Sequence, residues 1–358
     1  KPSGVWIMAY TTIDDPELYF QAKTYTGNAS TLAVTFDGSE NMQPDWLWLK
    51  KTGASGHHFV FDSVRGVGKE LNPSTNDEES SPANYVSSFD TNGFTIGSDT
   101  DINPSGGAAV AWAWKAGTSF SNDASATSIG TIDSSGSRNT TAGISIITYT
   151  GNQSAATIAH GLGALPGMLI IKNRTSTDSR DWAVYHKNLS GNNKYLSLNL
   201  TSAELTDAAT FNNTAPTTTV FSSASSVEVN ESGKTFIAYC FTDIKGYSKF
   251  GGYKGNGNAD GTFVYTGFRP AFLLFKGNNT SDWQLFDNKR DPENPVEQAL
   301  HPDIINTAST DQELDFLSNG FKLRDTGAHV NGDGVNFIYM AFAESPFVNS
   351  NGIPTNAR

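Results

Sequence analysis

The chain has 358 residues, 17% of them charged, and a formal net charge of −12 at pH 7. This acidic balance argues against a nucleic-acid interface, which needs a basic face to neutralise phosphates. The single cysteine, Cys240, excludes an internal disulfide framework, and no apolar run reaches the roughly 18 residues of a membrane-spanning helix. Because 22 Phe, 12 Tyr and 7 Trp can still fill a core, we expect two or three folded domains.

The first apolar stretch, residues 4–10, predicts a β-strand. Its sequence Gly-Val-Trp-Ile-Met-Ala-Tyr resembles that of a later strand, residues 234–239. Residues 1–19 are therefore either the last strand of a preceding module or a strand that completes the sheet of the first module. The sequence alone leaves both possibilities open.

From residue 20 onward, four short motifs recur three times in the same order. They are Tyr-x-Gly-Asn, Pro-x-x-Leu-x-x-Lys, an aromatic stretch, and Asn-x-Ser/Asp-Gly followed by an apolar strand. The Tyr precedes the Pro by 19, 17 and 17 residues, and the last Gly precedes the final aromatic of its strand by eight each time. Shared order and spacing indicate three copies of one module. The landmark residues are Tyr25, Asn28, Pro44 and Gly106; Tyr149, Asn152, Pro166, Trp182 and Gly233; and Tyr253, Asn256, Pro270, Trp283 and Gly334.

Each motif predicts a particular part of a β-sheet. Tyr-x-Gly-Asn is typical of a strand that ends in a turn, where Gly and Asn tolerate positive φ. The prolines predict strands that begin just after them, where the missing N–H does least harm. In the fourth motif Val110, Trp112 and Trp114 share one face, and several copies are apolar on both faces, which predicts a central strand. Since helical periodicity is nearly absent, we predict an all-β fold of three tandem antiparallel β-sandwich modules.

The motifs also predict the boundaries of the modules. The first module covers residues 20–117, the second residues 144–246, and the third, with a C-terminal tail, residues 247–358. Residues 118–143 are rich in Ser, Thr and Gly without apolar periodicity, and we expect a flexible linker there. The second and third modules join directly, which predicts a stiff pair.

Recognisable catalytic motifs are absent from the sequence, so we predict a non-enzymatic protein without a cofactor. The six histidines do not recur at matching positions, and each is expected at the surface or in a turn. Cys240 lies in an apolar strand, which favours a buried, inert thiol. Trp46, Trp48, Trp112 and Trp114 alternate along apolar strands, so core packing is favoured over a sugar-stacking platform.

Two polar clusters are weak candidates for a binding site. Asn256, Asn258 and Asp260 mimic the first half of a calcium loop, but Gly267 stands where such a loop needs its bidentate Glu. An Asn/Gly turn between strands is the favoured interpretation.

The second cluster is an Asp-x-x-Arg motif, Asp62 with Arg65 and Asp287 with Arg290, which becomes His186 and Leu189 in the second copy. We favour a salt bridge in a loop over a shared ligand site.

Three segments carry a resemblance to a known class of proteins: residues 267–271 (Gly-Phe-Arg-Pro-Ala), 315–324 and 339–347. They resemble a repeat module in uncharacterised virion proteins of tailed phages, especially marine and cyanobacterial ones. The resemblance covers almost the whole chain, and residues 349–358 are similar to the C-terminus of such proteins. It implies a virion or tail-fibre-like protein with concanavalin-like (lectin-like) sandwiches, and it supplies no catalytic residues.

The sequence therefore predicts a non-catalytic phage virion protein, either an exposed appendage such as a receptor-binding tail fibre or a capsid decoration. The alternative is a soluble, lectin-like carbohydrate-binding protein, and a polysaccharide-degrading enzyme is a third, less favoured hypothesis. Expected partners are other virion proteins, a host-surface glycan or receptor, and further copies of the chain, without nucleic acid or membrane insertion. The expected location is the surface of the virion.

Overall fold

The computed structural model describes residues 10–354, and their regular structure is almost entirely β-sheet. Strands of each sheet pair antiparallel, which confirms the predicted all-β, antiparallel fold class. The helices of the described residues are short: η1 (Pro16–Leu18), α1 (Ala124–Thr127) and α2 (Val227–Asn230). No helix of residues 10–354 is long and apolar enough to cross a membrane. The strand predicted over residues 4–10 lies outside the described residues except for Tyr10.

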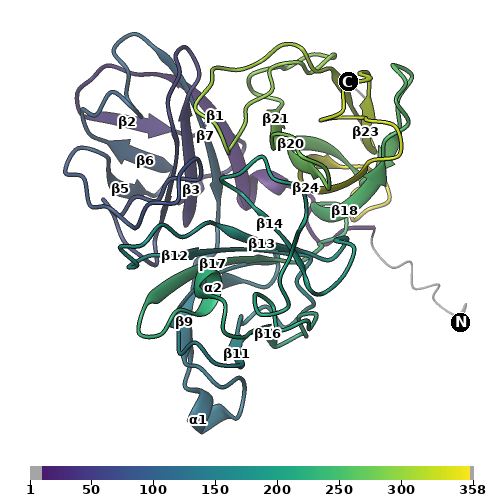
Figure 1. Ribbon diagram of the computed structural model, residues 1–358. Helices are drawn as coiled ribbons and strands as arrows, with labels where there is room; N and C mark the ends of the chain where they lie inside the picture. The colour runs from purple at the N-terminus through teal and green to yellow at the C-terminus, as the bar shows by residue number, and fades with distance from the viewer. Residues whose placement is uncertain (1–9, 355–358) are drawn as a thin grey trace, which may run out of the picture.

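The sheets form three pairs of a larger and a smaller sheet, and we call each pair a lobe (Figure 1). In lobe A the larger sheet has the order β1 (Phe20–Thr26), β7 (Ala108–Trp114), β3 (Trp46–Lys51), β4 (His58–Asp62). Its smaller sheet has the order β2 (Leu32–Thr35), β6 (Gly93–Ile96), β5 (Val86–Asp90).

Lobe C repeats this arrangement strand for strand. Its larger sheet has the order β18 (Ser248–Lys254), β24 (Asn336–Pro346), β20 (Phe268–Gly277), β21 (Gln284–Asp287). Its smaller sheet has the order β19 (Phe263–Tyr265), β23 (Gly320–Leu323), β22 (Leu314–Leu317).

Lobe B contains the same four-stranded unit within a wider sheet. That unit is β10 (Ile144–Thr150), β17 (Thr235–Phe241), β12 (Met168–Asn173), β13 (Ala183–His186). Beyond β13 follow β14 (Lys194–Ser197) and β15 (Leu205–Thr206), and beyond β10 follow β9 (Ser134–Asn139) and β8 (Thr118–Asn122). The smaller sheet pairs β11 (Ala156–Ala159) with β16 (Val220–Ser223).

The prediction of a flexible linker over residues 118–143 is wrong. This segment forms β8, α1 and β9, and β9 pairs antiparallel along β10 from Ile144 to Tyr149. A Cβ at Gly136 would lie only 1.8 Å from the carbonyl oxygen of Ile146, so the missing side chain permits the close approach of β9. Backbone pairing needs no apolar periodicity, which is why a Ser/Gly-rich segment can add strands to a sheet.

The strand that follows the fourth motif is central in all three larger sheets, as predicted. β7, β17 and β24 each have a partner on both sides. The proline prediction holds for Pro44 and Pro166, which lie two residues before the first residues of β3 and β12, but it is wrong for Pro270. Pro270 lies inside β20 at a shift of the strand register, where an irregularity in the pairing tolerates the missing N–H.

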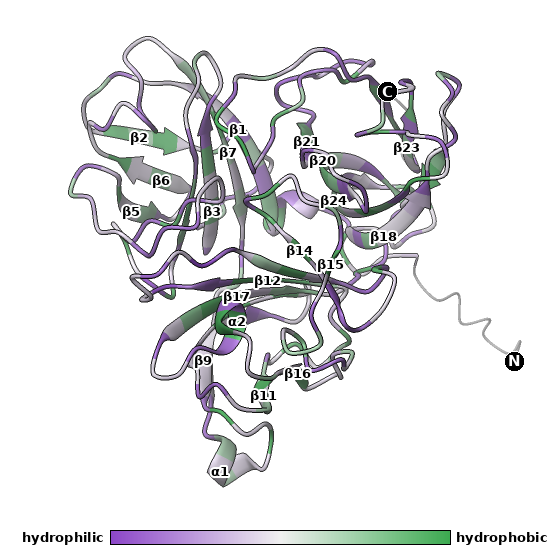
Figure 2. Ribbon diagram, in the orientation of Figure 1, coloured by the Kyte–Doolittle hydropathy of each residue, from purple (hydrophilic) through white to green (hydrophobic). Residues whose placement is uncertain are grey.

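Each larger sheet has two buried faces. In β7, Ala111 and Ala113 face the small sheet of lobe A, whereas Val110, Trp112 and Trp114 face away from it. The outward faces of the three larger sheets meet in one central core, which contains residues of lobes A, B and C. Figure 2 shows hydrophobic residues on these strands and hydrophilic ones mainly in the outer loops. The lobes therefore surround a shared core rather than forming a row.

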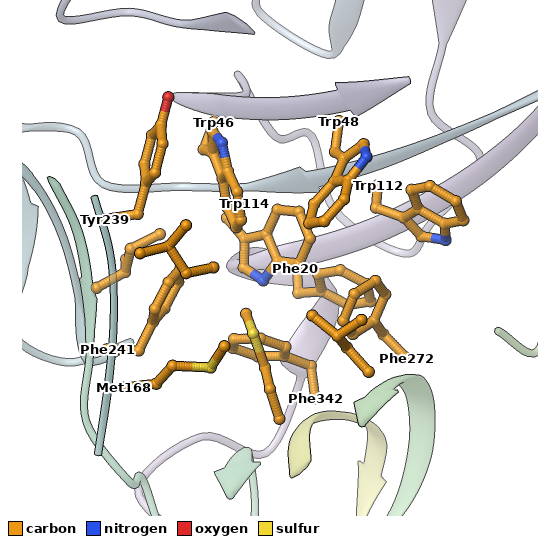
Figure 3. Packing of buried hydrophobic residues seen from close by; sticks show 14 of the residues in the cluster. Phe20, Trp46, Trp48, Trp112, Trp114, Met168, Tyr239, Phe241, Phe272 and Phe342 are labelled. Atoms are coloured by element: carbon orange, nitrogen blue, oxygen red, sulfur yellow. The ribbon is translucent and has the colours of Figure 1, made fainter. Parts of the chain in front are cut away.

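Aromatic rings fill much of this central core (Figure 3). The ring of Trp46 stacks on Tyr239 of lobe B with centroids 4.7 Å apart, and the ring of Trp114 lies 5.3 Å from Phe272 of lobe C. Phe241 and Phe342 close the contact between lobes B and C at 6.2 Å. Since each such pair adds about 0.5–1.5 kcal/mol beyond its buried area, these contacts fix the lobes relative to one another.

Candidate functional site

The Asn landmarks form the same hydrogen-bond network in each lobe. Asn103, Asn230 and Asn331 are fully buried. Their side-chain oxygens accept the backbone N–H groups of Asn28, Asn152 and Asn256, at 2.7, 2.8 and 3.1 Å. Each Nδ2 group then donates to two backbone carbonyls and to the partner Asn side chain. These residues therefore clamp two turns together and have a structural role.

The other landmarks support the same pair of turns. The hydroxyls of Tyr25, Tyr149 and Tyr253 donate to backbone carbonyls at 2.6 to 2.7 Å. Gly106, Gly233 and Gly334 all have positive φ, between 67° and 75°, which strains any residue with a Cβ. The recurrence of these residues therefore reflects the geometry of the turns.

The proposed calcium ligands are occupied by this network. The Asn256 side chain binds Asn331 and the backbone of Asn258, and the Asn258 side chain accepts the N–H of Asp260. Asp260 forms a salt bridge with Lys322 at 2.8 Å. Among residues 10–354 no three His, Cys, Asp or Glu side chains form a group that could hold a metal ion.

The Lys of the Pro-x-x-Leu-x-x-Lys motif joins each lobe to a neighbour. Lys50, Lys172 and Lys276 are fully buried, and burial lowers the pKa of each ammonium group to about 8. Their Nζ atoms reach the carbonyls of Ile305 in lobe C, Asn76 in lobe A and Thr201 in lobe B, at 3.4, 3.3 and 3.5 Å. The contacts run A to C, B to A and C to B, so they close a ring.

Tryptophan side chains reinforce two of these contacts. Trp182 donates its indole N–H to the carbonyl of Asn72 in lobe A, and Trp283 donates to Ser197 in lobe B. All six tryptophans at Trp46, Trp48, Trp112, Trp114, Trp182 and Trp283 are at most 1% exposed. Core packing is therefore confirmed for these residues, and none of the six can stack on a sugar from solvent.

The Asp-x-x-Arg motif lies at the contact between lobes A and B, which we call the A/B seam. The Arg65 guanidinium and the Asp62 carboxylate lie 2.5 Å apart with both side chains inaccessible to solvent. Asp62 also accepts the hydroxyl of Tyr239 from lobe B at 2.8 Å. Despite the opposing effect of burial, Asp62 and its neighbours raise the pKa of Arg65 above its usual range. The favoured interpretation, a salt bridge, is confirmed, but it is buried between lobes.

The contact between lobes C and A, the C/A seam, contains the same kind of Asp–Arg pair. Arg290 binds Asp287 at 2.6 Å, and Asp287 accepts the indole N–H of Trp112 from lobe A at 3.1 Å. Trp112 occupies the position of Tyr239 in its own sheet, because Trp112 pairs with Trp48 as Tyr239 pairs with Ile170. The carboxylate therefore meets a hydrogen-bond donor of the next lobe in both seams.

The contact between lobes B and C, the B/C seam, lacks the Asp–Arg pair, and the facing strand of lobe C explains why. Met340 of β24 occupies the position of Tyr239 and Trp112, and its thioether has no hydrogen to donate. A carboxylate facing Met340 would be buried without that donor. Lobe B instead has His186, whose Nε2 lies 3.1 Å from the Tyr339 carbonyl, and Leu189 replaces the arginine.

The B/C seam contains a cavity of about 330 Å³ that is lined by Leu189, the residue at the position of the arginine. Its walls are Leu189, Ser190 and Glu204 of lobe B and Gly252 and Asn278 of lobe C, with further apolar contacts from β24. The Glu204 carboxylate accepts the backbone N–H and the hydroxyl of Ser190, at 2.7 and 2.6 Å. This cavity is the best candidate for a ligand site, and the sequence motifs did not reveal it. The signal was present in the departure of the second copy from Asp-x-x-Arg.

The histidine prediction is wrong for four of the six residues. His58, His160, His186 and His301 are at most 6% exposed. Burial lowers the pKa of His160 to about 4 and that of His186 to about 3. Cys240 is fully buried, and burial raises the pKa of its thiol to about 12, as expected for an inert side chain.

Fold and site together define an all-β protein of three interlocked lobes whose recurring polar residues hold the lobes together. The chain belongs to the family described as Domain of unknown function (DUF7483), whose model matches residues 15–346. This match spans all three lobes as one unit. No curated protein and no solved structure matches the chain.

Proposed function

We propose that this chain is a non-catalytic structural protein of a phage particle, exposed either as part of an appendage such as a tail fibre or as a capsid decoration. One observation carries the proposal. The polar residues that recur, such as Asp62, Lys172 and Asn230, are all used to close turns or to join lobes. A protein whose shared chemistry serves only its own assembly suits a role as a rigid body that presents its outer loops. The resemblance of residues 315–324 and 339–347 to phage virion proteins supports the same conclusion.

The expected partners follow from this role. Strands β1 and β18 are edge strands of their sheets, and unpaired backbone groups at an edge invite another strand. Such edges would support contacts with other virion proteins or with further copies of the chain. Static light scattering at micromolar concentration tests the second possibility, and a monomer would contradict a homo-oligomer.

The decisive experiment is immunogold labelling of purified phage particles with an antibody raised against this chain. Gold on tails or fibres would support an appendage and direct attention to a host-surface glycan or receptor. Gold spread over heads would support a capsid decoration. Particles that are free of gold, while the antibody detects the chain in the infected lysate, would overturn the proposal.

A soluble, lectin-like protein is the second candidate, because one groove offers exposed aromatic rings. Phe263 and Tyr265 of β19 are 43% and 53% exposed, and they line a groove of about 450 Å³ with Lys187 and Asn188 of lobe B. Aromatic faces next to polar side chains are suited to binding sugars. Glycan-array binding that is lost in Tyr265→Ala, with an unchanged unfolding midpoint, would favour this candidate.

A further inference from the structure

The A/B and B/C seams each contain a glutamate at an equivalent position. In lobe A the backbone pair Glu70–Ser80 places Glu79, and in lobe B the pair Tyr195–Leu205 places Glu204. The backbone N–H of Glu79 donates to the Arg174 carbonyl at 2.9 Å, and the N–H of Glu204 donates to the Asn278 carbonyl at 3.2 Å. The two glutamates are therefore structural equivalents, and so are Arg174 and Asn278.

In the A/B seam two guanidinium groups bind the carboxylate of Glu79. Arg174 forms two hydrogen bonds with Glu79, at 2.8 and 3.1 Å, and Arg65 approaches the same carboxylate to 3.4 Å. Paired N–H donors of this kind match the geometry of a carboxylate and give a strong, specific contact. Glu79 is only 9% exposed, so its charge is neutralised within the protein.

In the B/C seam both guanidinium groups are missing but the carboxylate remains. Leu189 stands at the position of Arg65 and Asn278 at that of Arg174, and both residues line the cavity together with Glu204. Within residues 10–354 no lysine or arginine nitrogen forms a salt bridge within 4.0 Å of the Glu204 carboxylate, which accepts hydrogen bonds only from Ser190. The carboxylate therefore keeps acceptor capacity toward the cavity.

Two lysines also line the cavity, and neither replaces the arginines. The Lys276 amine already donates to three backbone carbonyls and to the hydroxyl of Ser281. Lys254 is exposed, so its flexible side chain can extend into solvent. Apolar walls from Leu189 and Ile338, together with the amides of Asn188 and Asn278, complete a lining suited to a cationic head on an apolar stem.

We propose that the cavity of the B/C seam binds a guanidinium group, which takes the place that Arg174 and Arg65 fill in the A/B seam. The group would come from an arginine side chain of a partner polypeptide or from a free guanidino compound. A cavity of about 330 Å³ is at the lower end of the range for small-molecule sites, roughly 300–1,000 Å³. The inference rests on the comparison of two seams of one chain and is independent of the proposed role in a virion.

Calorimetric titration of the full chain with L-arginine tests the proposal. We expect saturable binding of one arginine per chain, and binding at least tenfold weaker for L-citrulline, which has the same shape without the charge. N-acetyl-L-argininamide distinguishes the two sources, since it mimics an arginine within a polypeptide. Binding of this compound as tight as that of arginine would indicate a side chain, and binding of the free amino acid alone would indicate a small guanidino compound.

Three variants make the test specific. Glu204→Gln should weaken arginine binding at least tenfold, whereas Glu293→Gln, at an exposed site in lobe C, should leave it unchanged. In Asn278→Arg the new side chain should occupy the cavity and abolish binding. It should also raise the unfolding midpoint, because it can pair with Glu204 as Arg174 pairs with Glu79. An unfolding midpoint of Asn278→Arg at or above that of wild type shows that its loss of binding does not come from misfolding. Equal binding of arginine and citrulline, or wild-type affinity in both Glu204→Gln and Asn278→Arg, would overturn the proposal.

Discussion

Replacement of Asp62 by alanine should strongly destabilise the protein at the A/B seam. Asp62 and Arg65 have no solvent-exposed side-chain surface, and Arg65 also contacts the carbonyl of Val60 and the hydroxyl of Tyr239. Without Asp62 the guanidinium stays buried with its main counter-charge removed. Breaking one side of such a pair costs about 3–5 kcal/mol.

The double variant Asp62→Ala/Arg65→Ala separates the cost of the lone charge from the value of the pair. We expect it to be less destabilised than the sum of the single variants by about 1–3 kcal/mol, because it removes the uncompensated charge together with its partner. Tyr239→Phe, which removes one hydrogen bond to the carboxylate, should cost about 1.5–3 kcal/mol.

Equilibrium unfolding in guanidinium chloride, followed by tryptophan fluorescence, compares the wild type with Asp62→Ala, Arg65→Ala, the double variant and Tyr239→Phe. The four tryptophans of lobe A lie in the central core, so their emission reports directly on separation of the lobes. An Asp62→Ala variant that loses less than about 1 kcal/mol, or strict additivity in the double variant, would refute the reasoning that the pair is buried and coupled.

Three further predictions address the lysines, the turn clamp and the segment between lobes A and B. The pKa values of Lys50, Lys172 and Lys276 are lowered to about 8 in the folded state, so the unfolded chain binds more protons than the folded one above pH 8. Their contribution to stability should therefore rise from pH 8 toward pH 10, and Lys276→Met should reduce the increase that denaturation midpoints at pH 8, 9 and 9.5 reveal. Asn230→Ala should destabilise lobe B by at least about 2 kcal/mol in chemical denaturation, because it leaves several buried backbone groups without partners, and a cost below about 0.5 kcal/mol would contradict the clamp. Limited trypsin digestion should leave the bond after Arg138 intact, since β9 is paired on both sides, and early cleavage there, seen by mass spectrometry, would restore the flexible linker.

The fold class and the central strands could be predicted because their causes are local. The alternation of Val110, Trp112 and Trp114 and the turn chemistry around Asn28 act within a few residues, and sequence patterns record such effects directly. The strands β8 and β9 could not be predicted in this way, because Ser134 and Gly136 pair through the backbone alone. The buried histidines were missed for a related reason. A single His186 carries no pattern, and its burial depends on the Tyr339 carbonyl of another lobe.

The arrangement of the lobes was missed although its signal is present in the sequence. A central strand with one face on its own small sheet and the other face equally apolar requires a second cover, and that cover can only be another sheet or a partner. Trp112, Tyr239 and Met340 occupy equivalent positions in three such strands. A tandem row joined by a flexible linker would have exposed all three of these faces to water. The apolar second face was therefore evidence for a closed arrangement.

The departures from exact repetition carry more functional information than the repetition itself. Asp62 and Asp287 face a donor of the next lobe, whereas the residue at the same position of lobe B, His186, faces a strand in which Met340 supplies none. The substitution of aspartate by histidine thus matches the loss of the donor, as expected where a buried charge needs a partner. The loss of the arginine is compensated only by Ser190, whose backbone N–H and hydroxyl donate to Glu204, while the carboxylate also lines a cavity. A carboxylate that is retained where its guanidinium partners have been lost is the feature expected of a site whose cationic partner is supplied from outside.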